Sequence, residues 1–342
     1  MTAVADTAPN PEPRRRTGKS FGYWFAANRG LFAAILIFAV MFGFYGWKQE
    51  IGLTANIINT AANKGALLAL VAMAQTIPVL TGGLDLSVGS IMVLTNCLAS
   101  VIVVGDPLMT TIGVIGVLLA GILCGVINGL IVVYGRLQPI IVTLATGAVY
   151  FGIALVFRPE PGGSVNFEFA DLMTRSFFAV PSTVILLVAV VLLVWLPYRN
   201  SVLGRAAYAI GSSEQAAYMS GVPIARAKVL AYTLSGFLAA IAGLLLTAIT
   251  YSGAAKAAIG ADYTLNSIGA VVIGGTSLFG GLGSAIGSIF GAFVMRTIGD
   301  LLIVFDINPV LQPLFVGVVL LLAVCIGSLR LLRIKNRLDL YR

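Results

Sequence analysis

The sequence has no histidine and few charged residues: Asp, Glu, Lys and Arg together make up only 10% of its 342 residues. Without histidine, the chain lacks the commonest metal ligand and the usual general base of enzymes. Soluble domains carry about a quarter charged residues, so this composition excludes an ordinary soluble domain. Hydrophobic residues instead account for 59% of the chain. The composition predicts an integral membrane protein, and its apolar segments hold no paired carboxylates that would suggest an intramembrane enzyme.

Cysteine is also scarce. Cys97, Cys124 and Cys325 all fall inside apolar runs, at spacings that fit no metal site. We expect them to be small buried thiols, and we predict neither a metal site nor a catalytic residue. The net charge of +8 could suit nucleic acid. In a membrane protein, however, an excess of Lys and Arg reports orientation, so no nucleic-acid partner is expected.

Ten apolar segments are candidates for membrane helices, because crossing the hydrocarbon takes about 20 apolar residues. They are residues 30–47, 56–80, 88–104, 110–134, 139–157, 181–197, 228–251, 264–275, 281–300 and 309–327. Segment 264–275 is too short to cross alone, and a re-entrant segment is the alternative there. The predicted fold is therefore all-α and polytopic, with about ten transmembrane helices.

The distribution of charge predicts the orientation. With the N-terminus inside and ten helices, most Lys and Arg fall in cytoplasmic segments and most acids fall outside, as membrane insertion favours. We expect residues 1–28 to be a disordered cytoplasmic tail, 29–329 the transmembrane domain and 330–342 a basic cytoplasmic tail. The longest outside loop, residues 158–180, is either a plain connector or a docking site for an extracellular or periplasmic protein.

A short polar stretch, residues 211–223, separates two long apolar segments. Ser212 and Gln215 have the spacing of a capping box, and Glu214 suits the positive end of a helix dipole. Gly221 and Pro223 favour a stop. We predict a helix of about two turns. It is either an ordinary loop element or a docking element for a cytoplasmic partner, and its cytoplasmic side favours docking.

Two glycine-rich stretches, residues 81–90 and 273–281, interrupt apolar segments. Paired helix breaks of this kind point to a transport pathway. Asp85 lies in the first break, where a charge is costly unless protein or water surrounds it. We expect Asp85 to cap the following helix rather than to contact a solute.

Glycine also recurs every four residues in two places. At that spacing glycines share one helix face and let backbones approach closely. The two ladders that we expect to pack against neighbouring helices are Gly121, Gly125 and Gly129, and Gly283, Gly287 and Gly291.

Four stretches, in this order, resemble the ribose-type sugar permeases of bacterial ATP-binding-cassette importers. They are TGGLDLSVGS at 81–90, GSSEQAAYMSG at 211–221, YTLSGFLAAIAG at 232–243 and AVVIGGTS at 270–277. The resemblance covers about residues 50 to 327. It implies a ten-helix, type II-like permease of the bacterial inner membrane that moves a small hydrophilic solute, a monosaccharide.

The resemblance also implies partners. A second permease subunit, identical or related, would pair with this one, and a periplasmic binding protein would deliver the solute. Two cytoplasmic ATPases would supply energy from ATP and Mg, so no cofactor is expected in the chain itself. By the same resemblance residues 213–221 form the coupling helix, with contacts to the ATPase expected from Ser213, Glu214, Gln215, Met219, Ser220 and Gly221.

Polar and glycine residues in or beside the apolar helices are the candidates for the translocation pathway. These are Gln75, Asp85, Ser87, Asn96, Asn128, Asn266, Gly274, Gly275 and Thr276. Each of the polar side chains is individually more apt to bond a neighbouring helix than a sugar. The alternative function is an ion-coupled secondary transporter, for which Asp85 and Lys64 would be the coupling groups.

Overall fold

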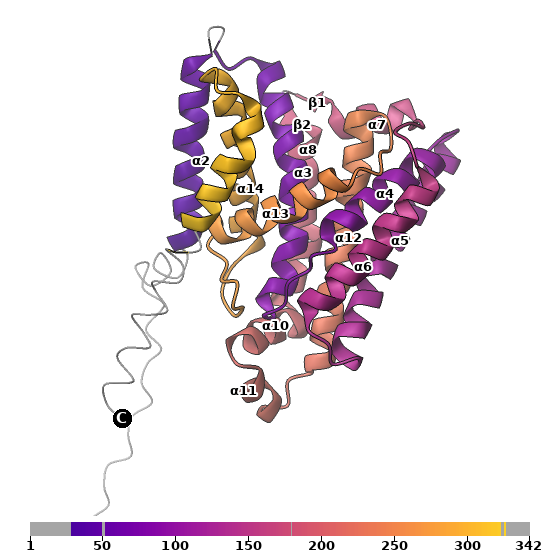
Figure 1. Ribbon diagram of the computed structural model, residues 1–342, viewed down its shortest axis with the longest axis vertical. Coiled ribbons are helices and arrows are strands. Elements are labelled where there is room, and N and C mark those ends of the chain that lie inside the picture. Colours follow the sequence, from indigo (N-terminus) through magenta and orange to yellow (C-terminus); the bar gives the residue numbers. More distant parts are fainter. Residues whose placement is uncertain (1–28, 50–51, 179, 323–324, 326–342) are drawn as a thin grey trace, which may run out of the picture.

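The computed structural model describes residues 29–49, 52–178, 180–322 and 325. The tails predicted at 1–28 and 330–342 lie outside the described residues. The described chain is almost entirely helical (Figure 1). Its helices are α2 (Arg29–Lys48), α3 (Ala55–Leu80), α4 (Val88–Ile102), α5 (Pro107–Tyr134), α6 (Pro139–Phe157), α7 (Phe167–Thr174), α8 (Ser182–Val190), α9 (Leu196–Asn200), α10 (Val202–Ser212), α11 (Glu214–Met219), α12 (Ile224–Thr250), α13 (Ala257–Ile273) and α14 (Ala285–Val304).

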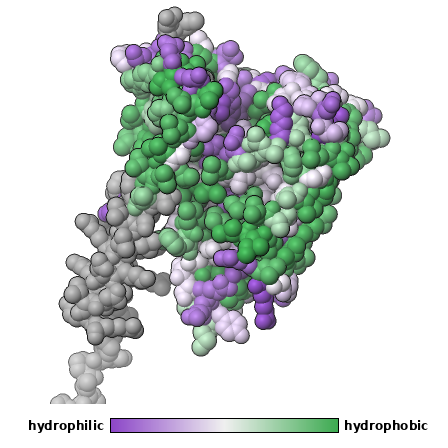
Figure 2. All heavy atoms as spheres, viewed as in Figure 1, coloured by the Kyte–Doolittle hydropathy of each residue, from purple (hydrophilic) through white to green (hydrophobic). Residues whose placement is uncertain are grey.

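Seven of the described helices are long and apolar enough to cross a membrane: α2, α3, α5, α6, the continuous helix Ser182–Asn200, α12 and α14. Three shorter apolar helices, α4, α13 and Gln312–Leu322, occupy the other three predicted segments. The prediction of an all-α polytopic protein is confirmed. Figure 2 shows hydrophobic side chains along the flanks of the bundle and hydrophilic ones at its two ends.

The largest difference from the predicted segments is the start of α13, at Ala257 instead of residue 264. The predicted segment left Asp262 outside the helix, but Asp262 lies within it and is exposed. At 17 residues α13 is about 25 Å long, at 1.5 Å of rise per residue. Its first residue follows the loop at Gly253, which pairs with Gly162, and its last leads to a loop that contacts Leu80 at the end of α3. Figure 1 shows the helix crossing the middle of the bundle obliquely, and the loop after it reaches the end of α3.

The core lies around α3 and α12. Most residues in the second half of α3 and in α12 are buried, whereas the peripheral α2 buries only Ala34 and Gly46 among its described residues. The predicted ladder on α5 packs against α12, because a Cβ on Gly125 would overlap the carbonyl oxygen of Tyr232 and one on Gly121 would overlap the carbonyl oxygen of Gly236. These contacts bring backbone directly against backbone, which only glycine allows.

The second ladder is shorter than predicted. Gly287 and Gly291 lie on α14 and face the backbone of Gly274 and Ala270 in α13 and its C-terminal cap. Gly283, however, precedes the helix, which begins at Ala285. It has a φ of +140° and packs against the side chain of Thr276. The four-residue spacing of the glycines therefore extends one glycine beyond the N-terminus of the helix, and that glycine belongs to the preceding loop.

The predicted outside loop is structured and lies at the end of the bundle opposite α11 (Figure 1). It contains α7 and a two-stranded antiparallel hairpin of β1 (Ser176–Phe177) and β2 (Val180–Pro181). Asn59 and Asn63 of α3 donate to the carbonyl oxygen of Thr174, both at 3.3 Å. These bonds hold the loop against the helical bundle.

The span Ser182–Asn200 is not a regular α-helix throughout. α8 passes into one π-helical turn, Val191–Trp195, before α9 begins. Leu187 and Val190 before the turn are buried, and so are Trp195 and Tyr198 within and after it. Both halves of the span therefore present the same side to the core.

Candidate functional site

The short helix predicted within residues 211–223 is present as α11, a six-residue helix at one tip of the molecule (Figure 1). Its N-cap is Ser213, whose hydroxyl accepts from the N–H of Ala216 at 3.3 Å. The predicted cap, Ser212, was wrong by one residue. Because α10 continues through Ser212, that hydroxyl donates instead to the carbonyl oxygen of Tyr208 in its own helix, at 2.9 Å.

One side of α11 packs inward and the rest is solvent-exposed. Ala217 is buried in a small apolar cluster with Ala206, Ile210 and Ala227. Tyr218 and Met219 are 74% and 85% exposed. The residues predicted to contact an ATPase are all exposed: Ser213, Glu214, Gln215, Met219, Ser220 and Gly221. Tyr218 was missed, although an aromatic residue in a polar stretch is a recognisable sign of a contact surface.

One ion pair and one backbone conformation fix how the chain leaves α11. Lys228 of α12 donates to the Glu214 carboxylate at 2.7 Å, so this charge is engaged within the chain. Gly221 has a φ of +72°, and a Cβ there would meet nothing within 4 Å. A side chain at Gly221 would therefore be strained by backbone conformation rather than by crowding.

α10 connects α11 to the membrane bundle through close glycine contacts. Gly211 lies against the carbonyl oxygen of Leu80 and the backbone of Gly281, and Gly280 lies against Gly82. The N–H of Gly281 donates to the Leu80 carbonyl at 3.1 Å. We call Gly82, Gly211, Gly280 and Gly281 the glycine junction. It brings together α10, the end of α3 and the loop between α13 and α14.

Tyr208 adds a side-chain bond beside the glycine junction. Its hydroxyl donates to the carbonyl oxygen of Gly283 at 2.9 Å. Burial raises the pKa of this phenol, with Arg199 acting in the opposite direction, so the phenol keeps its proton at neutral pH and remains a donor. A displacement of α10 would therefore be passed to the loop before α14.

Asp85 is fully buried in the break between α3 and α4. Its carboxylate accepts from the N–H and hydroxyl of Ser87, at 3.0 and 2.5 Å, and from the hydroxyl of Ser235 in α12 at 2.8 Å. Asp85 was expected to cap α4, but the N-cap residue is Ser87. The carboxylate binds that residue rather than the N–H groups of the first turn.

The hydrogen bonds of Asp85 continue into a buried network. Asn128 of α5 donates to the Ser87 hydroxyl at 2.7 Å, and Tyr150 of α6 can donate to the Asn128 side-chain oxygen at 3.0 Å. Three predicted pathway residues, Asp85, Ser87 and Asn128, therefore lie together. Ser235 and Tyr150 were missed, since nothing near them in the sequence marks them as partners. The network joins four membrane helices.

The other pathway candidates lie elsewhere. Asn96 donates to Thr247 at 2.8 Å and accepts from the N–H of Ala254 at 3.0 Å, which ties α4 to the end of α12. Thr276, Gly274 and Gly275 are in or beside the loop before α14, where Gly275 touches Gly30. Asn266 is half-buried in α13. The nine residues predicted for the translocation pathway therefore do not line one common cavity or surface in this structure.

Gln75 differs from all of these. It is fully buried in α3, and neither its amide oxygen nor its amide nitrogen has a hydrogen-bond partner. A buried polar group without a partner costs about 1–3 kcal/mol. Such a group is expected to find its partner in another state of the protein or in a solute.

Replacing Gln75 by leucine should leave the protein as stable or make it more stable, by up to about 1–3 kcal/mol, because an unpaired amide is removed at similar volume. Asn128→Leu is the control, since it takes partners from Ser87 and Tyr150 and should destabilise. Thermal unfolding of both purified variants measures this. Equal loss of stability in the two would contradict the assignment of Gln75 as unpaired.

Comparisons with known proteins show which family this chain resembles. Residues 57–324 match the family described as "Branched-chain amino acid transport system / permease component". The ribose import permease RbsC of Bacillus subtilis (strain 168) is 36% identical over 274 residues, covering 79% of this chain and 83% of the relative. RbsC of Escherichia coli (strain K12) is 32% identical over 312 residues, covering 89% and 94%. The D-allose permease AlsC of the same strain is 31% identical over 305 residues, covering 88% and 91%. No solved structure matches significantly.

Proposed function

Because the chain belongs to this family of transport-system permease components, and is a transport subunit rather than an enzyme, we propose that it carries a monosaccharide or sugar-like solute inward. The importer it serves is driven by ATP hydrolysis in a separate cytoplasmic subunit, which binds ATP and Mg. A second permease subunit and a periplasmic binding protein complete the assembly. Both termini of the chain, and α11, are cytoplasmic in this proposal.

The buried polar groups favour a neutral solute. Among the described residues, Asp85 is the one charged side chain that is buried, and the other buried polar side chains are hydroxyls and amides. The family description names branched-chain amino acids, but a zwitterion would need buried partners for both of its charges. A sugar needs hydroxyl and amide partners only. The permeases named above for ribose and allose are consistent with this choice.

An ion-coupled transporter fits less well. Asp85 is satisfied by three donors from the protein, and Lys64 is exposed rather than paired with it. A coupling carboxylate would need access to protons or sodium in some state. The arrangement around Asp85 instead supports a structural role in holding α4, α5, α6 and α12 together.

The observation that carries the proposal is α11: a short capped helix that exposes an aromatic and a thioether side chain and is joined through α10 to the glycine junction. Tyr and Met are enriched at protein interfaces, and a single buried Tyr can contribute about 2 kcal/mol or more to binding. We infer that Tyr218 and Met219 enter a groove of the ATPase. Movement of that subunit would then reach α3 and α14 through α10.

Tyr218→Ala should weaken association with the ATPase and lower solute-stimulated ATP hydrolysis by about tenfold or more. Tyr134→Ala is the matched control, because Tyr134 is 70% exposed at the end of α5 and lies outside α11. Copurification from native membranes and ATPase activity in liposomes measure the two effects. If both variants retain the ATPase equally and hydrolyse ATP at the wild-type rate, α11 is only a connecting loop.

A further inference from the structure

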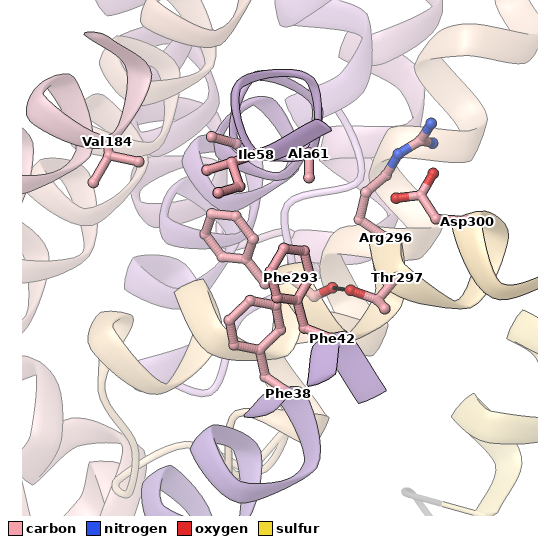
Figure 3. A pocket seen from close by; sticks show the side chains of 10 residues that line it. Phe38, Phe42, Ile58, Ala61, Val184, Phe293, Arg296, Thr297 and Asp300 are labelled. Atoms are coloured by element: carbon pink, nitrogen blue, oxygen red, sulfur yellow. Dashed lines mark hydrogen bonds between the residues drawn. The ribbon is translucent and has the colours of Figure 1, made fainter. Parts of the chain in front are cut away.

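A cavity of about 220 Å³ lies between α2, α3, α8 and α14, away from the polar network around Asp85 (Figure 3). One wall of the cavity is aromatic. The ring of Phe38 lies 5.5 Å from that of Phe42 and 5.3 Å from that of Phe293, measured between centroids. Ala61, Ala62 and Val184 complete an apolar surface. This part of the cavity has the chemistry of an acyl-chain site.

The other end of the cavity is charged. Arg296 and Asp300 are one turn apart on α14, and Figure 3 shows their charged groups side by side. The Nε of Arg296 is buried and has no hydrogen-bond partner. In the part of the chain that the structure describes, no ion pair within 4.0 Å joins Arg296 to Asp300. Arg296 therefore keeps free donors next to an anion.

These groups are ordered along the helix axis. At 1.5 Å per residue, Phe293, Arg296 and Asp300 lie about 16, 12 and 6 Å before the last residue of α14. Toward the C-terminus of α14, the cavity lining is thus apolar first, then carries the cationic Arg296 and finally the anionic Asp300. A phospholipid with an amine headgroup has the same order: acyl chain, phosphate, ammonium.

The surroundings of the cavity are suited to lipid. Ile58 lines it and is 38% exposed, so the cavity reaches the surface. On either side, α2 exposes Val40 and Phe44, and α8 exposes Ile185 and Val188. Apolar side chains that flank an opening on a membrane protein face hydrocarbon. A sugar arriving in water would not meet this opening.

We propose that the cavity is a binding site for a zwitterionic phospholipid with a primary amine, of the phosphatidylethanolamine type. One acyl chain packs on the phenyl rings, the phosphate accepts from Arg296, and the ammonium group donates to Asp300. An anionic lipid without an amine would leave Asp300 facing a second negative charge. A choline headgroup has no N–H to donate. The site lies opposite α11, which is the outer leaflet if α11 is cytoplasmic as proposed above.

Native mass spectrometry of the purified protein, with equal amounts of phosphatidylethanolamine, phosphatidylcholine and phosphatidylglycerol, tests this site. Wild type should retain the first about tenfold better than the other two, the change expected for one charge-assisted hydrogen bond. Arg296→Gln should reduce retention of phosphatidylethanolamine, and Asp300→Asn should remove the preference over phosphatidylcholine. Ala61→Phe should block the cavity with both charges intact.

Arg175→Gln is the control, because Arg175 and Asp171 form an exposed pair on and beside α7 with the same four-residue separation. It should leave lipid retention unchanged. Gel filtration confirms that every variant is folded. Equal retention of the three lipids by wild type, or equal retention by Arg296→Gln and Arg175→Gln, overturns the site. Displacement of the lipid by a monosaccharide overturns it as well. None of these outcomes depends on ATP-driven transport, so the site can fail without the proposed function.

Discussion

Replacing Gly125 by leucine is expected to abolish most of the yield of folded protein. A Cβ at this position would overlap the carbonyl oxygen of Tyr232 and approach the Cα of Thr233 at 2.9 Å. Both are backbone atoms of α12, so no rotamer change can make room. Overpacking costs about 1–3 kcal/mol where side chains can adjust, and more where they cannot. Quantifying the monodisperse protein extracted from membranes measures the effect.

Gly43→Leu is the control for this experiment. Gly43 is exposed on α2, and a Cβ there would meet nothing within 4 Å. Its yield should stay near that of wild type. Comparable yields from the two variants would mean that α5 and α12 do not touch at Gly125.

The second large effect is expected at the glycine junction. Gly211→Ala would place a methyl group against the Leu80 carbonyl oxygen and the Gly281 N–H. Separating α10 from the end of α3 by one methyl group should leave the membrane helices folded. It should also break the path from α11 to the bundle. We expect transport to fall by about an order of magnitude or more, the loss that a misplacement of about 1 Å can cause, while ATP hydrolysis continues.

Two further variants keep this test decisive. Ser212→Ala changes the next residue and removes only an intrahelical bond to Tyr208, so it should transport normally. Tyr208→Phe removes the bond to Gly283 without adding volume and should weaken coupling even if Gly211→Ala fails to fold. Solute uptake per ATP hydrolysed in liposomes is the measurement. A wild-type ratio in both Gly211→Ala and Tyr208→Phe would show that the junction transmits nothing.

The apolar membrane segments were predictable because their signal is local. Long apolar runs between charged or glycine-rich stretches gave all ten segments, with ends displaced by a few residues in most cases. The start of α13 was missed because the predicted segment began only after Asp262, although an exposed carboxylate is tolerated inside a helix. The cap of α11 was displaced by one residue for a related reason: consecutive serines offer two equivalent caps, and the end of α10 decides between them.

The buried network was only partly predictable. Asp85, Ser87 and Asn128 could be chosen because polar residues in apolar segments are unusual. Their partner Ser235 is 150 residues from Asp85 in the sequence, and only the packing of α12 brings it near. The same holds for the unpaired state of Gln75, which depends on every helix around it. Residue type marks a candidate, but tertiary contacts decide its role.

Because of the π turn at Val191–Trp195, the number of residues in the span Ser182–Asn200 does not by itself decide which side of its second half faces the core. Each residue of an α-helix turns the chain by about 100°, whereas a π turn takes about one residue more to complete a circle. If the same residues were wound as a regular α-helix throughout, Trp195 and Tyr198 would be rotated by about a quarter of a turn from the side of Leu187 and Val190. The turn thus absorbs one inserted residue in a single place. The span can therefore be one residue longer while the buried residues before and after the turn still face the same side of the bundle.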